Sequence, residues 1–281
     1  MGISVFAPGF SGSLIAIAMG IYHDLVEILA NPLRDMRRNV RFLAPFLIGA
    51  GISAVLFVLA FRFLFETYIQ ATYFLFVGLI AGNLPLILQD LRRHKPRRQH
   101  ALGGIVTFTI AVALMLLSPL PNGGAAAGAA VIQSGYLFFA LGGILAGATA
   151  LIPGMSISAV LIMMGIYPQL IIAAESLLRL DFTYLPQMLL FLLFVLAGVV
   201  LISRGIKSLF KKIPALAYTA VFGFVAGSLV GILIQSFRLY DPNFTWPLGI
   251  IMLAAGLGIS ALFFFLSKSM GKFTVLDSAN L

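Results

Sequence analysis

A segment of eighteen residues occurs twice in this chain, and this repetition constrains the fold more than any other feature. The first copy reads PGFSGSLIAIAMGIYHDL at 8–25, and the second reads PGMSISAVLIMMGIYPQL at 153–170. The copies lie 145 residues apart and share ten of eighteen positions, and the same offset continues without a gap into the following sequence. Further identical pairs at this offset are Tyr73 and Tyr218, Gly78 and Gly223, and Gly82 and Gly227. We therefore predict two homologous halves, 1–125 and 126–281.

The rest of the chain is apolar enough to cross a lipid bilayer several times. Hydrophobic residues make up 61% of the 281 residues and charged residues only 10%, which excludes an ordinary soluble domain. A spanning helix needs about 20 predominantly apolar residues. Such runs lie at 42–65, 68–89, 101–117, 186–203, 214–236 and 247–266, and an apolar arm at 131–152 leads into the second copy. We predict an all-α integral membrane protein with one membrane domain, and we expect Asn83 to Pro85 to interrupt the span at 68–89.

Basic residues between these runs predict the orientation of the chain. The net charge of +9 is typical of loops that fix topology, so we expect no nucleic-acid partner. The basic connections, predicted to be cytoplasmic, are 34–41, 92–98, 204–212 and the C-terminal tail, and the predicted outer ones are 62–67, 118–130, 175–181 and 238–245. The segments that follow the two copies then lie on opposite sides of the membrane. This parity predicts two inverted-topology repeats that meet at the midplane, as in many secondary transporters.

The repeated segment combines a helix breaker with hydroxyl groups. Proline lacks an amide proton and glycine tolerates unusual backbone, so Pro-Gly ends any incoming helix and a new helix begins near the serines. The first turn of that helix has unpaired amides and a partial positive charge, which favour phosphate. Its apolar run reaches only about half a bilayer at about 1.5 Å per residue. Two copies therefore predict broken or re-entrant helix hairpins that form one phosphate site, whereas a single copy would fit a simple kink or cap.

The predicted phosphate-binding residues come from both copies of the segment. They are Pro8, Gly9, Ser11, Gly12, Ser13, Pro153, Gly154, Ser156 and Ser158. With the GIY that follows each copy and the GLIAG stretch at 78–82, this paired motif resembles the polyprenyl-phosphate transporter family over nearly the whole chain. The resemblance implies that undecaprenyl phosphate, the lipid carrier of envelope glycans, moves from the outer to the cytoplasmic leaflet of the inner (plasma) membrane for reuse.

The motif departs from the family pattern at two places. Ile157 stands where the family usually has glycine, which narrows the second half of the predicted site. Ser4 and Val5 stand where the family often has an acidic residue, so proton coupling through that carboxylate is not expected here.

Further polar residues are secondary candidates for lining the site or coupling transport. Asn83 and Ser228 are partners at the 145-residue offset, and Arg62, Arg204 and Lys207 are the nearest cations for a phosphate. His23, Asp24 and Glu27 form either an ordinary interfacial turn or a titrating site. We expect no cofactor and no metal, and coupling to a proton or sodium gradient stays open. Glycines at 78, 82, 223 and 227 are spaced for close helix packing.

Two other functions fit parts of the sequence. Undecaprenyl pyrophosphate phosphatases also carry Pro-Gly-x-Ser, but they need glutamates and an arginine beside the serine. The acidic residues, all expected at interfaces or in loops, are Asp24, Glu27, Asp35, Glu66, Asp90, Glu175, Asp181, Asp241 and Asp277. Hydrolysis by general acid–base catalysis is therefore disfavoured. Transport of a small soluble anion is the other alternative, and it would not require a lipid tail.

Overall fold

The computed structural model describes residues 36–94, 96–117, 136–150, 152, 155–239 and 241–270. This part of the chain is helical and contains no strand. The helices of the first half are α4 (Met36–Thr67), α5 (Ile69–Arg93), the short 3-10 helix η1 (Arg98–His100) and α6 (Ala101–Leu117). Those of the second half are α8 (Tyr136–Ala150), α9 (Ile157–Met163), α10 (Tyr167–Leu178), α11 (Leu185–Lys212), α12 (Pro214–Arg238) and α13 (Trp246–Met270).

The predicted all-α membrane class is confirmed. Four helical stretches, α5, η1 with α6, α11 and α12, are long and apolar enough to cross a bilayer, and the bent pair α9–α10 is a candidate fifth span. Large apolar side chains point outward along them: Val200 and Leu201 of α11 are 71% and 72% exposed. A lipid environment favours such a surface, because water would penalise a continuous exposed apolar face.

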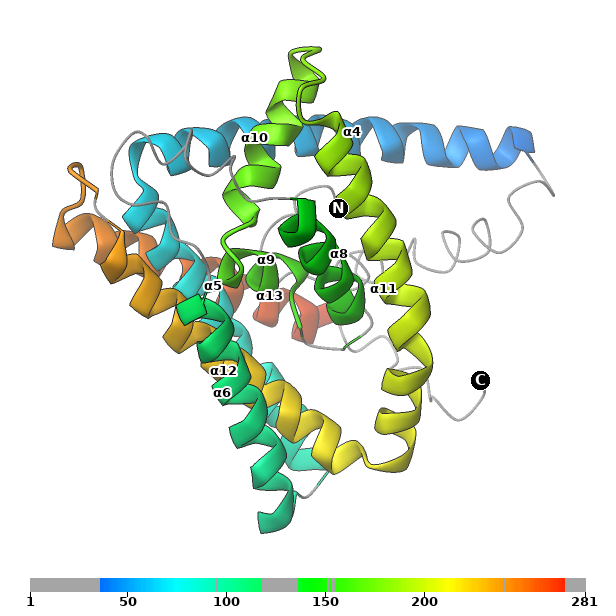
Figure 1. Ribbon diagram of the computed structural model, residues 1–281, viewed down its shortest axis with the longest axis vertical. Coiled ribbons are helices and arrows are strands. Elements are labelled where there is room, and N and C mark those ends of the chain that lie inside the picture. Colours follow the sequence, from blue (N-terminus) through cyan, green and yellow to red (C-terminus); the bar gives the residue numbers. More distant parts are fainter. Residues whose placement is uncertain are drawn as a thin grey trace.

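Helix boundaries recur at the offset seen in the sequence. Shifting α5 (Ile69–Arg93) by 145 residues gives the bounds of α12 (Pro214–Arg238), and shifting the start of α6 gives the start of α13. The packing partners recur as well: α6 packs on α12, α13 packs on α5, and α5 contacts α12 between them (Figure 1). Each of these helices therefore packs on a helix from the other half, α5 on α13 and α12 on α6. The opposite orientation of the two halves across a membrane stays a prediction.

Glycines allow these helices to approach each other closely. A Cβ atom added to Gly78 in α5 would overlap the backbone carbonyl of Leu253 in α13, and one added to Gly223 in α12 would overlap that of Gly104 in α6. The predicted packing role of these glycines is confirmed, because a larger residue would force the helix axes apart.

Several predicted irregular segments are helical instead. The predicted turn at 62–67 and most of the predicted basic loop at 34–41 belong to α4, and the predicted turn at 175–181 begins inside α10. The span at 68–89 is not interrupted: α5 runs through Pro85, and α12 is likewise continuous through Ser228. Proline removes one amide donor, but the other backbone hydrogen bonds of a membrane helix have no water to compete with them. The predicted basic loop at 204–212 is the end of α11, whose 28 residues extend about 42 Å at 1.5 Å per residue, beyond a hydrocarbon core of about 30 Å.

The second copy of the repeated segment is bent. α9 and α10 meet at an angle of 109°, as expected for a broken or re-entrant segment. Gly165 makes the bend with a φ of 70°, its N–H donates to the Ile162 carbonyl, and the next N–H donates to the Leu161 carbonyl, both at 2.9 Å. These two bonds form a Schellman C-cap, which favours glycine. The GIY sequence therefore ends α9 at Met163, earlier than the expected end near Tyr167, and starts α10.

The buried core lies where α5, α9 and α12 meet. Phe76 of α5, Ile162 of α9 and Ile232 of α12 are fully buried and belong to one apolar cluster. The stacked rings of Phe61 and Phe76 join α4 to this cluster. The core thus fixes the second copy of the repeated segment against the two central helices.

Candidate functional site

Ser156 begins the helix of the second copy. It occupies the N-cap of α9 with an extended backbone (φ −104°, ψ 126°), and its side chain makes no capping hydrogen bond. Ser158 follows in the first turn of α9 and is buried. Ile157 separates the two serines, so one hydroxyl belongs to the N-cap and the other to the second residue of a buried, seven-residue helix.

A small cavity lies beside Ser156, enclosed by α5, α9 and α12. Its polar lining consists of Asn83, Ser156 and Ser228. The other lining residues are Ile80, Ile87, Met155, Ala159, Phe224 and Val225. The structure therefore brings the second-copy serine together with both secondary candidates that the 145-residue offset had paired.

The polar groups of the cavity are partly engaged within their own helices. The Asn83 amide nitrogen donates to the Leu79 carbonyl at 2.7 Å, and the Ser228 hydroxyl donates to the Val225 carbonyl at 2.7 Å. An amide nitrogen carries a second hydrogen, and a hydroxyl can rotate toward a new acceptor. Asn83, Ser156 and Ser228 can therefore offer neutral hydrogen bonds to an anionic headgroup.

The cavity is closed to a phosphate group in this conformation. It encloses about 20 Å³, and one water molecule needs roughly 10–15 Å³. Ser228 is 1% exposed, so its hydroxyl has no direct route to the surface. Among the described lining residues, a phosphate head would fit only after a movement of α5, α9 or α12.

Several predicted site residues lie outside the described residues. These are Pro8, Gly9, Ser11, Gly12, Ser13, His23, Asp24, Glu27, Pro153 and Gly154. Arg204 and Lys207 lie on α11, but their side chains are outside the described part of the structure. For all of these residues a role in the site stays a prediction.

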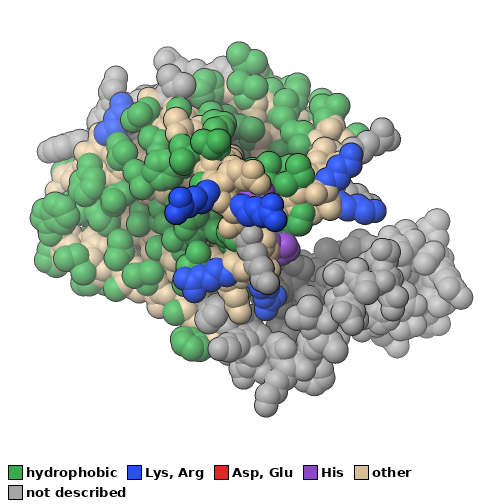
Figure 2. All heavy atoms as spheres, turned by 90° about the horizontal axis from the view of Figure 1, so that it is seen from below, with side chains coloured by type: hydrophobic (Ala, Val, Ile, Leu, Met, Phe, Trp, Pro, Cys, Tyr) green, Lys and Arg blue, Asp and Glu red, His purple; other side chains and the backbone are tan. Residues whose placement is uncertain are grey.

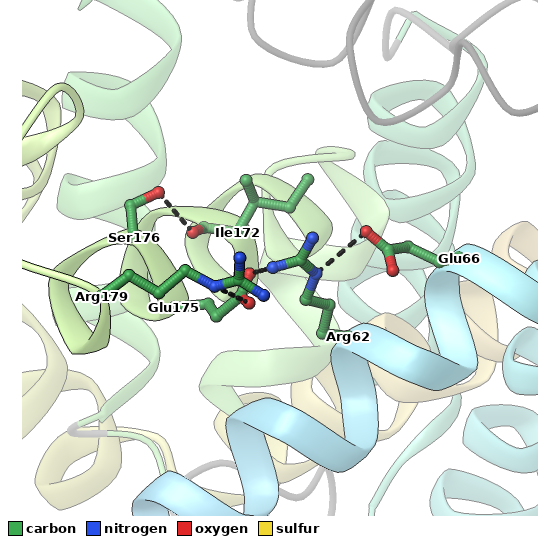
Figure 3. Close-up of polar contacts among 6 residues, drawn as sticks. All are labelled: Arg62, Glu66, Ile172, Glu175, Ser176 and Arg179. Carbon is green, nitrogen blue, oxygen red and sulfur yellow. Dashed lines mark hydrogen bonds and ion pairs between the residues drawn. The ribbon is translucent and has the colours of Figure 1, made fainter. Parts of the chain in front are cut away.

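Arg62 belongs to an ion-pair cluster, away from the residues that line the cavity. Its guanidinium pairs with Glu66, one turn away on α4, at 2.9 Å and with Glu175 of α10 (Figure 3). Arg179, the C-cap residue of α10, approaches the same Glu175 carboxylate at 2.8 Å. Arg62 is therefore neutralised in this conformation and joins α4 to α10.

Glu175 does not lie in the turn expected at 175–181. Glu175 lies inside α10, and its side chain is only 3% exposed. Burial is tolerated because two guanidinium groups compensate the carboxylate. Asp241 does lie in the predicted loop but is buried, and its carboxylate accepts the Gln70 N–H at the start of α5.

Signals for the missed residues exist in the sequence. Ile80 and Val225 are offset partners, as are Asn83 and Ser228, and all four line the cavity. Glu175 and Arg179 have the i, i+4 spacing of a helical ion pair, which favours a helix over the expected turn.

Comparison with known proteins shows the family of the chain. The model of an undecaprenyl phosphate translocase-like family matches residues 1–241. The chain belongs to this family. A polyprenyl-phosphate transporter of Staphylococcus aureus (strain NCTC 8325 / PS 47) is 28% identical over 279 residues, which cover 98% of this chain and 94% of that protein. No solved structure matches the chain.

Membership of the undecaprenyl phosphate translocase-like family confirms the resemblance inferred from the paired motif. The family description and the relative's name both point to transport of polyprenyl phosphate. The cavity between α5, α9 and α12 is the candidate functional site of this family member.

Proposed function

We propose that this protein moves polyprenyl phosphate, specifically undecaprenyl phosphate, from the outer to the cytoplasmic leaflet of the inner membrane, where the carrier lipid is reused. The lipid is not chemically changed. The phosphate head crosses through the centre of the protein while the isoprenoid tail remains in the bilayer.

The observation that carries this proposal is the meeting of Asn83 and Ser228 with Ser156 in one cavity. Asn83 and Ser228 occupy equivalent positions of the two halves, so the cavity lies where equivalent helices meet. A site at the interface of two repeats can be opened from either side when one repeat rocks against the other. The predicted first-copy serines, Ser11 and Ser13, would complete the site from the opposite leaflet.

The lining chemistry suits binding of a headgroup. Its described polar groups are one amide and two hydroxyls, set among apolar side chains. Hydrolysis of a pyrophosphate would in addition need a positioned general base or acid. A transporter that binds and releases its cargo unchanged requires only reversible hydrogen bonds and a conformational change.

A three-part assay in proteoliposomes tests the proposal. A short-chain polyprenyl phosphate reports flipping, the corresponding pyrophosphate reports release of free phosphate, and radiolabelled inorganic phosphate reports uptake of a soluble anion. We expect flipping well above protein-free vesicles, with neither phosphate release nor anion uptake. Flipping no faster than in protein-free vesicles contradicts the proposal, phosphate release favours a phosphatase, and saturable uptake favours a soluble-anion transporter.

A further inference from the structure

A second hollow lies on the opposite face of α5. It is an open depression of about 490 Å³ whose described lining consists of Pro85, Leu88, Gln89, Arg92 and Arg93, and we call it the basic hollow. Positions 85, 88, 89 and 92 recur at the spacing of one helix face. The residues of α5 that line the closed cavity, Ile80, Asn83 and Ile87, fall on the other face at 100° per residue. A single helix wall therefore separates the two spaces.

The basic hollow has one apolar end and one cationic end. Pro85 and Leu88 form its apolar part, Gln89 follows, and Arg92 and Arg93 form the last turn of α5. Pro85 and Arg92 are seven residues apart, about 10 Å along the axis at 1.5 Å per residue. This order matches a lipid whose phosphate lies at the membrane surface and whose first isoprenoid units point toward the bilayer core.

Positive charge gathers around this end of the molecule. Figure 2 shows Lys and Arg side chains over this face, with no acidic side chain visible among the described residues. The end of α5 lies against the α11–α12 junction. The ring centroids of His94 and Tyr218 are 4.3 Å apart in a stacked pair, and those of Tyr218 and Phe210 are 5.3 Å apart. Lys211 and Lys212 end α11 there. These described basic side chains would attract an anion, and guanidinium groups match the geometry of phosphate oxygens.

Along the axis of α5, the spacing between the closed cavity and the basic hollow suits a phosphate head that moves from the midplane to the membrane surface. Asn83 and Arg92 are nine residues apart, about 14 Å at 1.5 Å per residue, close to half of a roughly 30 Å hydrocarbon core. With Asn83 at the midplane, Arg92 and Arg93 reach the headgroup level. Pro85 lies between them and cannot donate to the Ala81 carbonyl, so this turn of the wall lacks one helical hydrogen bond.

We propose that the basic hollow is a second binding site for the cargo, which holds the phosphate head of polyprenyl phosphate at the cytoplasmic end of its path. Arg92 and Arg93 bind the phosphate, and Pro85 and Leu88 contact the first isoprenoid units. This inference rests on the proposed function, since it assigns the same lipid to a second place along α5.

Equilibrium binding to the protein in nanodiscs tests the inference. Two double variants are compared, and each removes two arginines from the region 92–98. Arg92→Gln/Arg93→Gln removes two cations from the hollow, whereas Arg97→Gln/Arg98→Gln removes two from η1 and its N-cap, which do not line it. The probes are a short-chain polyprenyl phosphate, the polyprenol of the same length, and phosphatidylglycerol as competitor. We expect the first variant to weaken binding of the phosphate roughly tenfold, while the second changes it by less than about twofold.

Binding of the polyprenol should not distinguish the two variants, because it lacks the phosphate. Equal effects of the two variants, or competition by phosphatidylglycerol as strong as that by polyprenyl phosphate, would overturn the assignment. If the double variant does not insert, Arg92→Gln alone is compared with Arg98→Gln, with a smaller difference in the same direction. Failure of the proposed function would appear separately, as wild-type flipping no faster than in protein-free vesicles, since binding is measured without transport.

Discussion

The buried carboxylate of Glu175 provides the sharpest test of how α4 and α10 are held together. Glu175→Gln keeps the size of the side chain but removes the charge that both Arg62 and Arg179 approach. Breaking a fully buried ion pair costs about 3–5 kcal/mol. Arg62 is 28% exposed and retains Glu66, so the cation left behind is partly solvated and partly paired. We therefore expect a smaller loss, about 2 kcal/mol.

Two neighbouring substitutions serve as controls because they alter the same cluster at its exposed edge. Arg179 is 70% exposed and Glu66 is 56% exposed. Exposed ion pairs contribute about 0–1 kcal/mol, so Arg179→Gln and Glu66→Gln should each cost less than about 1 kcal/mol.

Thermal unfolding in nanodiscs measures the difference. A loss of about 2 kcal/mol lowers the melting temperature of a protein of this size by roughly 4 °C, and the controls should lower it by less than about 2 °C. A Glu175→Gln variant as stable as either control would refute the reasoning, because the carboxylate would then not be the buried centre of the cluster.

Three further perturbations follow from packing, capping and topology. Gly223→Ala should destabilise by about 1–3 kcal/mol because its Cβ meets the Gly104 carbonyl, whereas Gly258→Ala, which meets nothing, should not; denaturation midpoints that coincide would contradict this. Asp241→Asn weakens the bond to the first turn of α5 and should cost about 1 kcal/mol in the same assay. The chain has no cysteine, so Arg97→Cys should react with an impermeant maleimide only from the cytoplasmic side and Asp181→Cys only from outside. Labelling of both from one side would contradict the predicted topology.

The sequence predicts the helices well because a lipid bilayer allows few backbone structures. A spanning segment must satisfy its backbone internally, so long apolar runs become helices with few alternatives. α6 has the predicted bounds of 101–117, and the recurrence of α5 as α12 follows the offset read from the repeated segment. The same restriction explains why Pro85 does not interrupt α5. The loss of one amide donor at proline is outweighed by the backbone hydrogen bonds of the neighbouring turns.

The site was predicted only in part because tertiary contacts decide which polar groups meet. Asn83 and Ser228 were identified through the offset and do share a cavity with Ser156. Glu175 was assigned to an outer turn with Arg179 and Asp181, because these charged residues separate two apolar runs. Its burial depends on Arg62, 113 positions earlier in the sequence, and no local pattern in α10 reveals that partner.

The most direct test of the central cavity is the initial rate of polyprenyl-phosphate flipping by a Ser156→Ala/Ser228→Ala variant. The matched control is Ser53→Ala/Ser203→Ala, whose hydroxyls bond carbonyls of their own exposed helix turns. We predict that the cavity variant folds, melts within a few degrees of the wild type and loses most of its flipping, while the control retains it. A cavity variant that flips the lipid as fast as the control would contradict the assignment of the phosphate head to the space between α5, α9 and α12.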